Sequence, residues 1–366
     1  MLDSAHLLVR SSNDNTSEAS RNVVACPSIQ PHQPMSAFHA KPARSMSMTL
    51  VLPGLLAHDS NDLAGREAFA MLGAWGTAKL ETEGIELALL RALGIHAAAP
   101  APLAAIGAGL HPGDRAVLYA DPVTLALGES VSIEGRVADL QADEVQAITD
   151  VLNTHFAEDE LAFSASRPDA WFATLPRAPD ATLTPLAAAV RRPLLPRLPQ
   201  GPEGKRWQRW GDEIQMLLHD HPVNRARDAA GRAPIGGIWF WGAGTWPSAA
   251  PIGRIDAFAD PGRVGDVARG AAALSGGTLQ PLGNSLASFH DRADTVVVAA
   301  LDDLDVLERR FLQPALQALR NGSVDALDVI ADGHGAAVTW KTRRPRWLDR
   351  FTRRRARLVV PRPEES

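Results

Sequence analysis

Short, continuously apolar segments alternate with helical segments through the second half of this chain, and this alternation constrains the fold more than any other feature. Residues 238–241 read IWFW, an uninterrupted apolar run. Such a run is typical of a strand that is buried on both faces of its sheet. Helical spacing of apolar residues follows at 264–274 and 304–319. Further apolar runs lie at 255–258, 295–301, 326–330 and 336–340. The alternation predicts a three-layer α/β core.

The first half of the chain continues this pattern, but prolines interrupt it. Residues 48–56 read MTLVLPGLL, which predicts a buried strand that ends in a Pro-Gly turn. A helix is expected at 84–93, and residues 97–110 are expected to form a loop with at most one helical turn. We expect Asp121-Pro122 to break the strand that precedes it, because proline has no N–H group to donate within a sheet.

The segment from Trp207 to Pro247 holds five of the nine tryptophans and the first candidate site. Apolar residues at helical spacing predict a helix that Pro222 ends. The polar residues after it could hold a phosphate or carboxylate, since arginine offers a planar fork of donors. They are His221, Asn224, Arg225 and Arg227. The alternative is that His221 and Asn224 cap and lock a tight turn while the arginines are solvated. Residues 239–241 suit core packing better than an aromatic stacking platform.

Acidic residues and one histidine follow the later strands, where metal ligands of α/β enzymes often lie. The candidates are Asp302, Asp303, Asp332 and His334. A two-metal site needs several such groups to converge. Paired aspartates after a strand are also common helix caps, so both interpretations stay open.

Composition excludes several classes of protein. The chain has 366 residues and a formal net charge of −5, which does not favour nucleic acid as a partner. One cysteine, Cys26, excludes an internal disulfide framework. No apolar run is long enough for a membrane span, and the first residues lack a secretory signal, so we expect a cytoplasmic protein. The arginines of the tail could contact an acidic partner, although a solvated tail is the simpler interpretation.

Three collinear runs resemble a known family. Residues 102–125 read PLAAIGAGLHPGDRAVLYADPVTL, Gly135-Arg136 stands before a helical segment, and residues 221–244 read HPVNRARDAAGRAPIGGIWFWGAG. These runs are similar to those of the archaeal-type cofactor-independent phosphoglycerate mutases. They are most similar to a bacterial branch of regulatory proteins of the pathogenicity-factor type E. The resemblance adds Arg136 to the expected ligand-binding residues.

The resemblance implies an alkaline-phosphatase-like, three-layer α/β core with an inserted α+β subdomain. The expected parts are a disordered leader at 1–47, core at 48–100, the inserted subdomain at 101–200, the rest of the core at 201–351 and an Arg-rich flexible tail at 352–366. The family's catalysis needs two divalent metals and a serine nucleophile. In this chain the first strand ends in Leu52-Pro53-Gly54 instead of a metal-binding Asp-Gly, and no counterpart of the nucleophile segment stands between Gly54 and Gly84.

These departures predict a regulatory or ligand-binding protein that has lost the two-metal phosphoryl-transfer site. We then expect no cofactor, and an anionic small molecule or a protein as partner. The alternative is an active phosphoglycerate mutase, or a related phosphotransfer enzyme, that uses Mn²⁺, Zn²⁺ or Mg²⁺.

Overall fold

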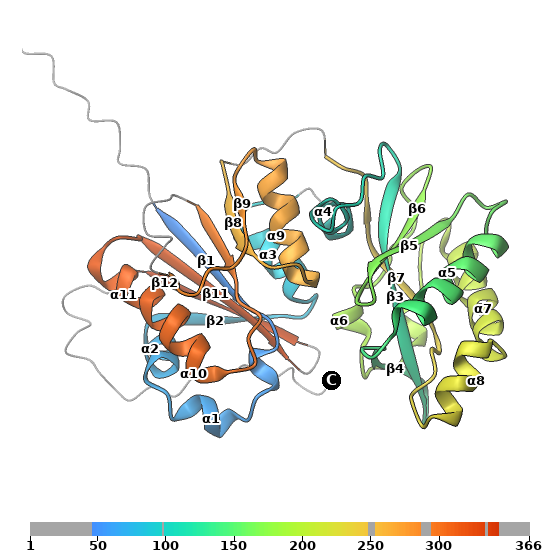
Figure 1. Cartoon of the computed structure of the whole chain (residues 1–366), viewed down its shortest axis with the longest axis horizontal. Helices are drawn as coiled ribbons and strands as arrows, with labels where there is room; N and C mark the ends of the chain where they lie inside the picture. The colour runs from blue at the N-terminus through green and yellow to red at the C-terminus, as the bar shows by residue number, and fades with distance from the viewer. Residues whose placement is uncertain (1–45, 97–98, 248–252, 287–293, 334–335, 344–366) are drawn as a thin grey trace, which may run out of the picture. The chain divides into compact units, whose positions relative to one another are not determined.

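The computed structural model describes residues 46–96, 99–247, 253–286, 294–333 and 336–343. Its larger sheet has seven strands in the order β2-β12-β11-β1-β10-β8-β9 (Figure 1). The strands are β1 (Ser47–Leu52), β2 (Gly76–Glu81), β8 (Asp256–Ala259), β9 (Leu279–Gln280), β10 (Thr295–Val298), β11 (Ala326–Gly333) and β12 (Ala336–Arg343). Strands β11, β1, β10, β8 and β9 are parallel, and β12 is antiparallel to both β11 and β2.

Successive side chains of the central strands enter two separate hydrophobic layers. Val51 packs with α3 (Ile85–Ala92) and α9 (Arg263–Leu274). Leu50 and Leu52 pack on the opposite face. The helical segments of that face are α2 (Glu67–Trp75), α10 (Leu304–Leu307), a π-helical turn (Glu308–Leu312) and α11 (Gln313–Asn321). The short η1 (Leu55–Ala57) and α1 (Ser60–Ala64) follow β1. Burial on both faces explains the continuous apolar strands, and the predicted three-layer α/β core is confirmed.

A second, antiparallel sheet occupies the middle of the chain. It has the order β4-β3-β6-β5, and β7 pairs with β3. Its strands are β3 (Ala116–Leu127), β4 (Val131–Arg136), β5 (Ala162–Arg167), β6 (Ala170–Leu175) and β7 (Gly237–Gly244). Helices α5 (Ala142–His155) and α7 (Gly204–His219) cover one face, where Trp207 packs against Phe240. The shorter helices are α4 (Pro100–Gly107), α6 (Leu186–Ala189), η2 (Leu195–Arg197) and α8 (Pro222–Ala229).

Two local expectations that rest on proline are wrong, and a third is incomplete. The expected loop at 97–110 contains the eight-residue helix α4, which Pro100 begins. Helix α7 ends before Pro222, as expected. Pro222 also stands at the first position of α8, where the first N–H of a helix needs no intrahelical partner. Strand β3 continues through Pro122, whose carbonyl accepts from the Val137 N–H at 2.9 Å.

Glycines allow α4 and α9 to pack with their backbones in contact. A Cβ atom at Gly107 would lie 1.9 Å from the Asp266 carbonyl oxygen, and one at Gly270 would lie 2.0 Å from the Leu103 carbonyl oxygen. Both positions therefore require glycine for close approach. Within the described ranges, no helix has the length and apolar character that a membrane crossing needs.

Candidate anion-binding site

A cavity of about 530 Å³ lies at the carboxyl ends of the parallel strands. Residues that end or follow four of these strands line it, namely Gly54 after β1, Asp260 after β8, Ala300 after β10 and Asp332 in β11. In open α/β sheets, ligands bind outside the carboxyl ends of the strands, where the strand order reverses. The order β11-β1-β10-β8 brings the carboxyl ends of these four parallel strands side by side, and the cavity lies outside them.

Two helices begin at this cavity. Gly84 precedes α3 and Gly262 precedes α9, and neither helix has a side-chain cap. The N–H groups of a first helical turn have no intrahelical partners and carry partial positive charge. Gly84 has φ +101°, a conformation that favours glycine. The two helix starts together provide backbone donors of the kind that bind oxyanions.

Arg136, at the end of β4, supplies a guanidinium to the same cavity. Its side chain is exposed, and among the described residues it makes no hydrogen bond or ion pair. Its positive charge acts on Asp332, where it lowers the carboxyl pKa. Arg136 is therefore a cation that is available to an incoming anion.

Asp332 gives the cavity a titratable carboxyl group. Burial raises its pKa to about 6, against the opposing effect of the Gly54 N–H, which donates to Oδ1 at 2.7 Å. The nearby charge of Glu86 raises the pKa further, and Arg136 opposes it. Asp260 adds a second carboxylate at the exposed rim, where its Oδ1 accepts from the Leu282 N–H at 3.1 Å. The cavity therefore combines anion-binding groups with acceptors for hydroxyl or amine donors.

Arg263, in the first turn of α9, is fully paired inside the protein. It donates to Glu86 Oε1 at 2.7 Å and to both Asp121 oxygens at 2.6 and 2.8 Å. Burial lowers its pKa, but the Asp121 and Glu86 carboxylates more than offset this, so the pKa lies above its usual range. The guanidinium also lies 4.2 Å from the centre of the Tyr119 ring. Trp241 Nε1 completes the group by donating to Asp121 at 2.7 Å.

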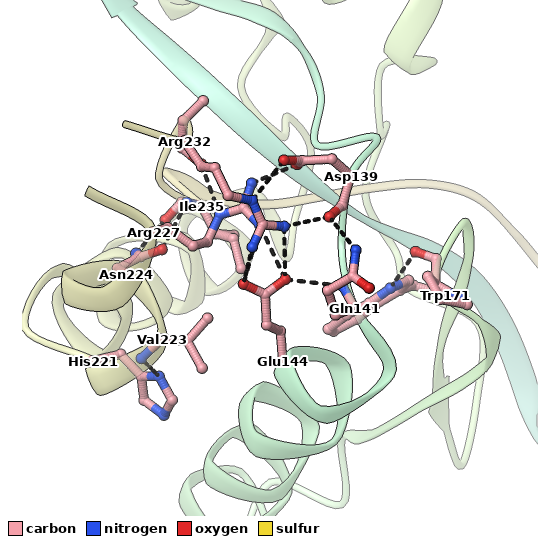
Figure 2. A network of polar contacts seen from close by, with 12 residues as sticks. Asp139, Gln141, Glu144, Trp171, His221, Val223, Asn224, Arg227, Arg232 and Ile235 are labelled. Atoms are coloured by element: carbon pink, nitrogen blue, oxygen red, sulfur yellow. Dashed lines mark hydrogen bonds and ion pairs between the residues drawn. The ribbon is translucent and has the colours of Figure 1, made fainter. Parts of the chain in front are cut away.

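The predicted ligand residues after α7 form local contacts of the fold (Figure 2). His221 caps α8, because its Nδ1 accepts from the Val223 N–H at 3.2 Å. Asn224 is buried, donates to the Leu218 and Ile235 carbonyls and accepts from the Ile235 N–H. The Arg225 guanidinium donates to the Asp220 carbonyl at 2.8 Å. None of the three lines the 530 Å³ cavity, and a binding role for them stays a prediction.

Arg227 lies in a cluster of four charged side chains that joins α8 to the start of α5. Figure 2 shows Arg227 and Arg232 converging on Glu144 and Asp139. The Arg227 side chain is 0% exposed, and its Nη2 lies 2.6 Å from Asp139 Oδ1. Hydrogen bonds from Arg227 and Arg232 lower the pKa of Asp139 to about 2. Arg227 does not line the cavity either, and its ligand-binding role stays a prediction.

The candidate metal ligands that the structure describes do not come together in one cluster. Asp303 caps α10, since its Oδ1 accepts from the Asp305 and Val306 N–H groups. Asp332 lies in the cavity, Asp302 is exposed, and His334 lies outside the described residues. Across the described ranges, no three His, Cys, Asp or Glu side chains come together to hold a metal ion. Because His334 is not described, a metal-binding role for these four residues stays a prediction, and we derive no metal-dependent step.

The residue types in the sequence did not identify Glu86, Arg263 or the starts of α3 and α9 as parts of this cavity. The signal that could have found them is a glycine directly before a helix and after a strand or turn. Gly84 and Gly262 both have this position.

The chain matches no protein-family model, and no curated protein matches it at a significant level. Solved structures that are similar to it include the following two. One is the PH0037 protein from Pyrococcus horikoshii, with 15% identity, a TM-score of 0.44, and coverage of 82% of this chain and 88% of that one. The other is a cofactor-independent phosphoglycerate mutase from Thermoplasma acidophilum DSM 1728, with 17% identity, a TM-score of 0.33, and coverage of 81% and 90%. Likenesses at this level assign no activity to the chain.

Proposed function

We propose that this chain is a regulatory protein that binds a small anionic molecule. The molecule binds in the cavity at the carboxyl ends of β1, β8, β10 and β11. The observation that carries the proposal is the exposed Arg136 guanidinium, which has no partner among the described residues and faces the same cavity as the uncapped starts of α3 and α9. Arginine and free helix N–H groups are complementary to phosphate and carboxylate oxygens.

The carboxylates of the cavity narrow the ligand class further. The carboxylates of Asp260 and Asp332 repel an anion that has no hydrogen-bond donors. They accept hydrogen bonds from a ligand that also carries hydroxyl groups. The Glu86 carboxylate is already paired with Arg263, so it is not available to a ligand. A hydroxylated phosphate or carboxylate meets both requirements, with its anionic group on Arg136 and its hydroxyl groups toward Asp332.

The proposal includes the loss of two-metal catalysis. Leu52-Pro53-Gly54 offers no carboxylate at the end of β1, and the Gly54 N–H instead donates to Asp332. Asp303 is engaged as a helix cap. Without metal ions, phosphoryl transfer lacks the cations that usually stabilise the negative charge on the transferring group. The proposed setting is the cytoplasm, where a protein partner would respond to the ligand-bound state.

Isothermal titration of the full chain with 3-phosphoglycerate tests the binding proposal. We expect saturable binding that Arg136→Gln weakens about tenfold or more, the effect of losing one charge-assisted hydrogen bond. Arg209→Gln is the matched control, because it removes the same charge from α7, away from the cavity. Absence of binding, or equal affinity in the Arg136→Gln protein, contradicts the proposal.

An active metal-dependent phosphoglycerate mutase, or a related phosphotransfer enzyme, is the second candidate function. The observation in its favour is that Asp332 lies in the cavity and is followed closely in sequence by His334. Elemental analysis for Mn and Zn, followed by an assay of phosphoglycerate interconversion with added Mn²⁺, separates the two functions. Activity that His334→Ala abolishes would establish the enzyme and overturn the loss of catalysis.

A further inference from the structure

A second cavity, of about 170 Å³, lies at β7 and is lined by residues of α7, of β3 and of the segment 184–199. Its walls are mainly apolar, and they include Ile133, Leu194, Leu198, Trp207 and Trp239. It shares no lining residue with the 530 Å³ cavity. Any ligand of this second cavity is therefore independent of the proposed anion site.

Two glycines keep this cavity open. Gly211 lies in the middle of α7 and Gly237 begins β7, and a Cβ atom at either position would meet no atom within 4 Å. Neither residue has a positive φ, so the backbone conformation does not require glycine. Glycine within a helix costs about 1 kcal/mol relative to alanine. The missing side chains instead leave room beside Trp207.

The mouth of the cavity is acidic. Asp212 and Gln215 of α7 line it and are exposed, and within the described ranges neither makes a hydrogen bond or ion pair. No lysine, arginine or histidine lines the cavity. A carboxylate beside indole rings suits a ligand with a flat apolar body and a positively charged end. In size, a cavity of about 150 Å³ lined by apolar side chains accepts a benzene ring.

We propose that this cavity binds a small aromatic amine, with its ring against Trp207 and its ammonium group on Asp212. The ring is buried against the apolar walls of the cavity. The ammonium group pairs with the Asp212 carboxylate, which no side chain of the described residues neutralises. The open space at Gly211 determines whether the ring fits, and Asp212 determines the preference for a cation.

Calorimetric titration of the full chain with benzylamine tests the proposal, and benzyl alcohol serves as the uncharged probe of the same shape. We expect one benzylamine to bind per chain. Gly211→Leu fills the space and is expected to weaken benzylamine binding about tenfold or more, the effect of losing a buried ring contact. Asp212→Asn is expected to weaken benzylamine about threefold to tenfold and to leave benzyl alcohol unchanged. Asp220→Asn removes a carboxylate from the end of α7 outside the cavity and is expected to change neither affinity.

Two results would overturn the proposal. One is that benzylamine shows no saturable binding to the wild-type chain. The other is that it binds Gly211→Leu as tightly as the wild type. If circular dichroism shows that Gly211→Leu is unfolded, Gly211→Ala takes its place, because alanine favours the helix and its Cβ has free space. Unchanged benzylamine affinity in a folded Gly211→Ala protein then also counts against the cavity as the binding site.

Discussion

Replacement of Asp332 by asparagine is expected to stabilise the protein above pH 6 and to have little effect near pH 4. Burial holds the pKa of this carboxyl at about 6, compared with its ordinary value of 3.8. Asparagine keeps an oxygen that can accept from the Gly54 N–H, so the substitution removes the charge and preserves the contact. The difference between the two proteins therefore reports the energetic effect of the ionised carboxylate.

The size and sign of the effect follow from the two pKa values. A difference of about 2 pKa units corresponds to about 3 kcal/mol, and partial exposure of the side chain reduces this to roughly 2 kcal/mol. The folded protein holds the proton up to a higher pH than the unfolded chain does. Stability of the wild type is consequently lost as the pH rises from about 4 to about 6. The asparagine variant keeps this stability, so the difference in stability between the two proteins grows over the same pH range.

Guanidinium chloride unfolding at pH 4.5 and pH 8, followed by tryptophan fluorescence, measures the difference. Asp260→Asn is the matched control, because it removes an exposed carboxylate from the rim of the same cavity. A stability gain for Asp332→Asn that is absent at pH 8, or equal at both pH values, would refute the attribution of the pKa to burial.

Three further outcomes are expected. Sulfate should bind roughly threefold or more tightly at pH 5 than at pH 7.5 in calorimetric titrations, because protonation of Asp332 removes a repulsive charge, and Asp332→Asn should abolish this pH dependence. Gly270→Ala should lower the unfolding free energy by roughly 2 kcal/mol or more, since its Cβ would lie 2.0 Å from a carbonyl oxygen of α4. Gly211→Ala, the control in denaturant unfolding, should not destabilise the protein. Arg263→Met should destabilise it by about 3 kcal/mol or more by leaving two buried carboxylates unpaired, whereas Arg136→Gln should not.

The fold could be predicted where burial determines the positions of apolar residues in the sequence. The central strands are covered on both faces, so their apolar runs are continuous and their positions follow from the sequence. Proline was misleading at Pro100 and Pro122, because its effect depends on whether the missing N–H group would have had a partner. The pairing of β7 with β3 also has no local signal, since a strand pattern does not identify its neighbour.

The candidate site was less predictable, because it is assembled from residues that are distant in sequence. Glu86 and Arg263 form an ion pair across 177 residues, and nothing local to either residue indicates the other. Arg136 lines the cavity and was expected only through the family resemblance. His221 and Asn224 were open to two interpretations. The structure gives His221 the contact of a helix cap, and Asn224 joins the Leu218 carbonyl of α7 to the Ile235 carbonyl.

The two arginines at the cavity illustrate why exposure and pairing matter more than residue type. Arg263 is surrounded by Asp121 and Glu86, so its charge is already compensated and a ligand would have to displace a buried carboxylate to use it. Its contribution is to fix the first turn of α9, whose N–H groups face the cavity. Arg136 has no such partner among the described residues, so its charge is available to a ligand. In the proposed site, Arg263 therefore holds the start of α9 in place and Arg136 supplies the uncompensated positive charge.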